Sequence, residues 1–98
     1  MRARRRRGAS PRALTVASFV SYLRLVQRDP VQPRQRFYAL SWQPGLFDES
    51  ALLRSYGQVG TRGGTVLTRF PDRQAAQPTI ERVVQRLLRQ NYQVVEWI

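Results

Sequence analysis

An aromatic residue, several glycines and two arginines stand close together in the middle of the chain. Residues 52–64 read Leu-Leu-Arg-Ser-Tyr-Gly-Gln-Val-Gly-Thr-Arg-Gly-Gly, so that Arg54 and Arg62 flank Tyr56. An aromatic ring beside accessible backbone and cations can pack on a sugar or a base and contact a phosphate. The same pattern is also typical of a tight hairpin in which Tyr56 is an ordinary core residue. Local chemistry leaves both interpretations open.

The segment that holds Tyr56 alternates between two sets of side chains, as a strand does. One face of a strand over residues 50–59 would carry Leu52, Arg54, Tyr56 and Gln58. The glycines in residues 61–64 permit a sharp turn, and residues 65–70 have the composition of a second strand. We therefore predict an antiparallel hairpin with Tyr56 near its turn.

The rest of the chain supplies further elements. Residues 36–43 are rich in apolar side chains on both faces, which predicts a central strand. Residues 78–90 have the apolar spacing of an amphipathic helix, with a proline in the first turn. A separate helical turn is expected over residues 72–77, and a last strand over 92–98. Residues 19–28 fit a helix or a strand, because periodicity does not separate the two in a short apolar run.

The composition argues against catalysis and metal binding. The chain has 98 residues, with no cysteine and no histidine, which excludes disulfides, thiol chemistry and the usual zinc sites. Only Asp48 and Glu49 are adjacent among the six acidic residues, so no pair of carboxylates suggests acid–base chemistry. We expect one small domain that is not an enzyme and uses no cofactor and no metal.

The formal net charge is +11, and most of it lies in the first third of the chain. Residues 1–36 hold ten arginines against one aspartate, whereas residues 37–98 hold seven arginines against five acids. Such asymmetry points to a polyanion, either nucleic acid or an anionic membrane surface. All basic residues are arginine, a bias typical of GC-rich bacterial genomes, so the choice of arginine is not itself a sign of phosphate recognition.

The arginine-rich start predicts a tail. Because dense like charges repel and bury nothing, residues 1–18 are predicted to be disordered and residues 19–98 to form the domain. The apolar run over residues 13–20 is too short for a membrane-spanning helix, which needs about 20 residues, and no cleavage site of a secretory signal follows it. We expect a cytoplasmic protein without membrane attachment.

Several blocks of residues resemble, in order and spacing, the WGR domain family, in particular its small bacterial members. They lie between residues 22 and 92 and read QRDP, RFYAL, QPGLF, LLRSYGQVG, FP and NY. The resemblance implies an α+β fold, a mostly antiparallel sheet of about four to five strands crossed by one amphipathic helix, with residues 20–28 as its first strand. It also implies a non-catalytic module, which in poly(ADP-ribose) polymerases binds DNA at strand breaks and relays that binding to other domains.

Tyr-Gly-Gln stands where the family has Trp-Gly-Arg. Tyr56 takes the position of the tryptophan that packs against the sugar at a broken DNA end, and Gly57 is unchanged. Gln58 takes the position of the arginine that takes part in the contacts around that end. Tyr56 keeps a flat ring. Gln58 keeps hydrogen-bonding groups but loses the cation, and a neutral hydrogen bond is about half as strong as a charge-assisted one. Arg54 and Arg62 are the nearest residues expected to compensate.

We therefore interpret the chain as a nucleic-acid-binding module that takes DNA in preference to RNA, at ends or nicks. The residues expected to contact nucleic acid are Arg36, Arg54, Tyr56, Gly57, Gln58 and Arg62. The alternative is a protein–protein interaction or regulatory domain that keeps the WGR fold without recognising DNA ends. The loss of both the tryptophan and the arginine from the motif favours that alternative.

Overall fold

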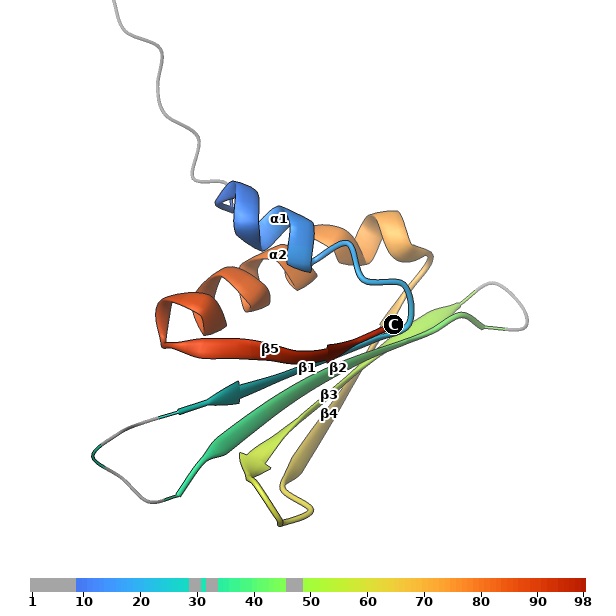
Figure 1. Ribbon diagram of the computed structural model, residues 1–98. Helices are drawn as coiled ribbons and strands as arrows, with labels where there is room; N and C mark the ends of the chain where they lie inside the picture. The colour runs from blue at the N-terminus through green and yellow to red at the C-terminus, as the bar shows by residue number, and fades with distance from the viewer. Residues whose placement is uncertain (1–8, 29–30, 32–33, 46–48) are drawn as a thin grey trace, which may run out of the picture.

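The computed structural model describes residues 9–28, 31, 34–45 and 49–98. These residues form two helices and a five-stranded sheet (Figure 1). The elements in chain order are α1 (Pro11–Val16), β1 (Tyr22–Gln27), β2 (Arg36–Gln43), β3 (Ser50–Gln58), β4 (Gly64–Phe70), α2 (Arg73–Arg89) and β5 (Tyr92–Trp97). The strand order is β4-β3-β2-β1-β5, with every neighbouring pair antiparallel. The predicted α+β fold is confirmed, and the ambiguous segment before the first loop is a strand.

The central position of β2 agrees with its apolar character on both faces. Tyr38, Leu40 and Trp42 point to the side on which the helices lie, and they join the core. On the opposite face Phe37 is also buried, and the guanidinium of Arg24 lies 4.7 Å from the centroid of its ring. A strand with both faces covered reads as a nearly continuous apolar run, which is what the sequence of β2 shows.

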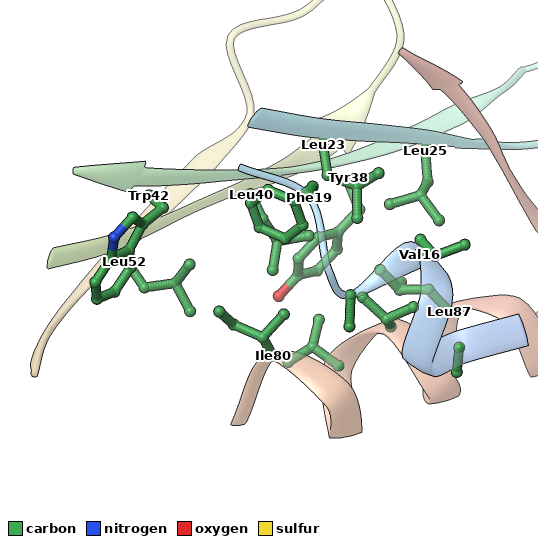
Figure 2. Close-up of a cluster of buried hydrophobic side chains, with 14 of the residues drawn as sticks. Val16, Phe19, Leu23, Leu25, Tyr38, Leu40, Trp42, Leu52, Ile80 and Leu87 are labelled. Carbon is green, nitrogen blue, oxygen red and sulfur yellow. The ribbon is translucent and has the colours of Figure 1, made fainter. Parts of the chain in front are cut away.

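The hydrophobic core lies between the sheet and the two helices, which cover the same face (Figure 1; Figure 2). Side chains from β1, β2 and β3 meet side chains from α1 and α2 there. The largest fully buried ones are Leu23, Leu25, Leu40, Leu52, Ile80, Val84 and Leu87. The ends of β3 and β4 that are joined by residues 59–63 project away from the helices (Figure 1).

Helix α1 lies in the segment that the sequence assigns to a disordered tail over residues 1–18. The Ser10 hydroxyl caps the helix by accepting a hydrogen bond from the Ala13 backbone N–H at 3.2 Å. Ala13 and Val16 are buried in the core that α1 shares with α2. The tail prediction is wrong for this helix, because its small apolar face finds a partner in α2. Residues 1–8 lie outside the described residues.

Helix α2 begins at Arg73, not at Pro78, and the separate turn predicted over residues 72–77 is part of it. An Asp72 carboxylate oxygen caps its start by accepting a hydrogen bond from the Ala75 backbone N–H at 2.8 Å. Pro78 has no N–H to donate within the helix. The turn before it stays helical because the cap and the contacts of Arg73 hold it in place.

Arg73 ties α2 to the connection between α1 and β1. Its guanidinium donates hydrogen bonds to the backbone carbonyls of Ala17, Phe19 and Val20 at 3.0, 2.7 and 3.1 Å. It also lies 4.7 Å from the centroid of the Phe19 ring, a favourable cation–π arrangement. Burial lowers the pKa of Arg73 below its ordinary value. Its donors are used within the fold, so this arginine has a structural role.

Candidate functional site

The face of β3 that carries Tyr56 runs from the core into solvent. Leu52 is fully buried on this face, opposite Trp42 of β2. Tyr56, four residues further along the same strand, is 41% exposed. Side chains two residues apart on a strand share a face and are separated by about 6.6 Å. The predicted placement of Leu52 and Tyr56 on one face is confirmed by the strand register. Tyr56 therefore marks the border between the core and an open surface.

Strand pairing places the side chains around Tyr56 in three rows. In the outer row, Arg36 lies opposite Gln58. In the middle row, Tyr38 and Gly64 lie on either side of Tyr56. In the inner row, Leu40 and Val66 lie on either side of Arg54. The exposed or half-buried members of these rows form a surface that we call the open face: Arg36, Arg54, Tyr56, Gln58, Gly64 and Val66. The ring of Tyr56 thus lies between two cationic positions.

The ring of Tyr56 is held between a second ring and a bare backbone. Tyr38 and Tyr56 stack with their centroids 5.7 Å apart and their planes 24° apart, within the range that favours aromatic pairs. Tyr38 is only 9% exposed and is packed among the core side chains (Figure 2). On the other side, a Cβ at Gly64 would lie 3.0 Å from Cε1 of Tyr56. We call Tyr38, Tyr56 and Gly64 the tyrosine platform.

Arg54 lies beside the tyrosine platform, and its hydrogen-bond donors are only partly used. Its Nη2 lies 3.4 Å from Oγ1 of Thr68, a long hydrogen bond. Its Nε is buried without a hydrogen-bond partner among the described residues. A guanidinium has five N–H donors, and an unpaired buried donor is costly. Because Nε is buried, an anion beside Tyr56 would contact the terminal N–H groups of this half-buried arginine.

A cleft opens at the outer row, where β2 and β3 leave the sheet. The Val59 backbone N–H donates to the Gln35 carbonyl at 2.8 Å, which extends the pairing beyond Arg36 and Gln58. Arg34, Gln35, Gln58 and Val59 line the cleft, whose volume is about 360 Å³. The cleft is adjacent to the open face because Gln58 belongs to both.

Gly57 and Arg62 are placed differently from the other predicted contact residues. A Cβ at Gly57 would lie 2.8 Å from Cα of Gly63 and 3.5 Å from Cε1 of Phe37, so a glycine is needed here by the packing of the turn on the opposite face. Arg62 is an exposed residue of that turn. The turn is closed by Thr61, whose Oγ1 donates to the Gln58 carbonyl at 2.7 Å.

The structure thus brings together Arg36, Arg54, Tyr56 and Gln58, with Gly57 beneath them and Arg62 in the adjoining turn. Sequence reasoning missed Tyr38, Gly64 and Arg34 as members of the site. The sequence indicates for Tyr38 only a place in the apolar central strand predicted over residues 36–43. Its contact with Tyr56 depends on the register between β2 and β3. Aligning these two predicted strands across the turn that joins them would have placed Tyr38 opposite Tyr56.

Other kinds of site find little support in the part of the chain that the structure describes. Within it, no group of three or more His, Cys, Asp or Glu side chains is arranged to hold a metal ion. No helix in this part is both long and apolar enough to cross a membrane. The open face therefore remains the best-defined candidate among the described residues.

Comparison with known proteins gives one family and one partial relative. The model of the WGR domain family matches residues 22–96, which span β1 to β5. An uncharacterized protein of Sinorhizobium fredii, y4dW, is 40% identical over 42 residues, which are 43% of this chain and 21% of that protein. The match thus covers about a fifth of the relative's length. No solved structure matches the chain.

Proposed function

The chain belongs to the WGR domain family, and from this premise we propose that it is a non-catalytic module that binds DNA at ends or nicks. WGR domains bind nucleic acid in proteins related to poly(ADP-ribose) polymerases. The observation that carries the proposal is the tyrosine platform. In it, the exposed ring of Tyr56 stacks against the buried ring of Tyr38, between the positions of Arg54 and Arg36. DNA is the proposed partner in preference to RNA.

The chemistry of the open face suits a sugar-phosphate chain. Tyr56 is 41% exposed, and its exposed ring surface offers an apolar area for a sugar or a base, a contact worth about 1–3 kcal/mol per base. Arg36 and Arg54 supply cations on either side, where they meet phosphate oxygens. Stacking and charge together hold nucleic acid without reading its sequence, which fits recognition of a break.

Substitution of Tyr56 tests this proposal. Tyr56→Ala removes the stacking surface, and we expect it to weaken binding to a labelled nicked duplex by about 5- to 150-fold, the equivalent of 1–3 kcal/mol. Tyr56→Trp restores a larger ring and should bind at least as tightly as the wild type. Fluorescence anisotropy at two salt concentrations gives the affinities. Tyr22→Ala, on the opposite face of the sheet, is the matched control.

Two results would count against the proposal in different ways. Equal binding of wild type and Tyr56→Ala to nicked, intact and single-stranded DNA would remove Tyr56 from the site. A wild-type protein that does not bind any of these at about 50 mM salt, where electrostatic binding is strong, would exclude DNA as the partner. The second result would favour a protein-interaction function.

An exposed apolar group on another part of the molecule makes protein interaction the second candidate function. Val20, Trp97 and Ile98 are all more than half exposed, and with Phe19 they border a hollow of about 230 Å³. Exposed apolar clusters of this kind mark protein contacts. On this alternative, Trp97→Ala weakens association with a purified partner protein and Tyr56→Ala does not, and the domain gives no DNA shift at low salt.

A further inference from the structure

We propose that the cleft beside Gln58 binds a phosphate group and that Arg34 supplies the cation that Gln58 lacks. This inference rests on the proposed function, since the phosphate belongs to the nucleic acid held at the tyrosine platform. It names a subsite and a residue that the motif does not indicate. On this proposal, the cation that the family motif carries at position 58 of β3 is supplied instead by the segment before β2.

The backbone holds Arg34 next to the position of the missing charge. Arg36 pairs with Gln58 across β2 and β3, and the hydrogen bond from Val59 N to Gln35 O, 2.8 Å long, continues this pairing outward. Arg34 is the next residue and lines the cleft together with Gln58. A side chain on the segment before β2 therefore reaches the same space as a side chain at position 58.

The composition of the cleft fits an anion. Its four described lining residues include one arginine, Arg34, and two glutamines, Gln35 and Gln58, and no acidic residue is among them. Guanidinium binds phosphate through two parallel hydrogen bonds, and carboxamide N–H groups add neutral donors. The volume of about 360 Å³ corresponds to roughly twelve water molecules, enough for a phosphate group with bridging water.

The position of the cleft relative to Tyr56 fits one continuous ligand. Gln58 lies two residues beyond Tyr56 on the same strand face, a separation of about 6.6 Å. A sugar on the Tyr56 ring can therefore have its own phosphate in the cleft, while Arg54 lies on the other side of the ring. The two cationic positions then contact the strand on both sides of the stacked nucleotide.

The experiment compares single-charge variants for binding to a labelled nicked duplex over a series of salt concentrations. Arg34→Gln should weaken binding about tenfold at low salt and reduce the slope of log affinity against log salt by about one, as expected for one lost phosphate contact. Arg12→Gln, an exposed arginine on α1, removes the same charge away from the cleft and should stay within about twofold of the wild type. The thermal unfolding midpoints should be the same for all three proteins.

A second variant tests the location of the charge. Gln58→Arg added to Arg34→Gln returns a cation to the cleft from the β3 side and should restore the affinity and the salt slope. If Arg34→Gln binds as Arg12→Gln does, Arg34 is not a phosphate contact. If Gln58→Arg does not restore the loss, Arg34 acts outside this cleft and the assignment is wrong. Either result is interpreted only if the wild-type protein binds DNA and Tyr56→Ala weakens that binding. Failure of this inference is therefore distinguishable from failure of the proposed function.

Discussion

At the level of single residues, Gly64 controls how the Tyr56 ring lies on the sheet. The ring occupies the space above Gly64, and a Cβ there would lie 3.0–3.3 Å from three of its atoms, Cε1, Cζ and the hydroxyl oxygen. Contacts this close require the ring to shift by a few tenths of an ångström. Because Tyr38 stacks on the ring at a centroid distance of 5.7 Å, we expect a larger side chain at position 64 to displace the ring from this stacked position. Gly64 is thus a positioning residue for the stacking surface.

The prediction is that Gly64→Val weakens binding to nicked DNA while the domain stays folded. Valine suits a strand, so we expect a change in unfolding free energy of less than about 1 kcal/mol in urea denaturation. Affinity should fall toward that of Tyr56→Ala. Because both changes act on one ring, Gly64→Val should have no further effect when Tyr56→Ala is already present.

The control for this prediction is Thr65→Val, the next residue on β4, whose side chain points to the opposite face. It places valine at the adjacent position, where a hydroxyl is replaced by a methyl group, without touching the ring of Tyr56. Additive losses in the Gly64→Val, Tyr56→Ala double variant would show that Gly64 acts through something other than the ring, and the positioning role would then be wrong.

At the level of elements, Arg73 joins α2 to the segment between α1 and β1. Its guanidinium contacts three backbone carbonyls, and Gln77 donates a further hydrogen bond to the Ala17 carbonyl at 3.0 Å. Hydrogen bonds from a charged donor contribute more than neutral ones, about 1.5–3 kcal/mol. The two helices therefore pack as one layer on the sheet.

We expect Arg73→Ala to lower the free energy of unfolding by about 2–3 kcal/mol, because it leaves the Phe19 and Val20 carbonyls without this partner. Urea denaturation measures the change. Arg82→Ala, on the exposed side of the same helix, is the matched control and should change the stability by less than about 0.5 kcal/mol. Equal midpoints for the two variants would contradict the anchoring role of Arg73.

The same elements show how far the sequence predicts this molecule. Alternation along β3 was enough to place Arg54 and Tyr56 on one face, because the period of a strand is fixed by its backbone. The start of α2 was misplaced, since Pro78 is typical of a first turn, and the contacts that extend the helix to Arg73 come from residues far away in the chain. Helix α1 was missed because six residues beside an arginine run have no periodicity long enough to detect.

Some residues of the site can be predicted from the local sequence, whereas others depend on how distant strands pair. The motif indicates Tyr56 and Gln58 directly, since they are consecutive members of one strand face. Tyr38 and Arg34 join them only through the register of β2 with β3, and Gly64 through that of β4 with β3. Registers follow from turn geometry and from the burial of a whole sheet, which a reading of separate segments does not supply.

At the level of the whole molecule, positive charge is divided between the first residues of the chain and the domain. Residues 1–8 contain five of the seventeen arginines, whereas the open face carries Arg36 and Arg54 beside the tyrosine platform. Charges that contact phosphates without a defined partner add affinity for every duplex alike and make it salt-dependent. On the proposed function, selectivity for a break would come from the folded part, which holds the Tyr56 ring and the cleft.

Two deletions separate these contributions. Removal of residues 1–8 should weaken binding to nicked and intact duplexes by the same factor and reduce the salt slope, with no change in unfolding free energy. Removal of residues 1–17 takes away Ala13, Val16 and Ala17 as well, all buried in the core, and should lower that free energy by at least about 2 kcal/mol. Anisotropy and urea denaturation give both quantities for each protein.

Two outcomes would contradict these predictions. If the shorter deletion abolishes the difference between nicked and intact DNA, break recognition resides in the first residues and not in the open face. If the longer deletion leaves the stability unchanged, α1 is not part of the folding unit.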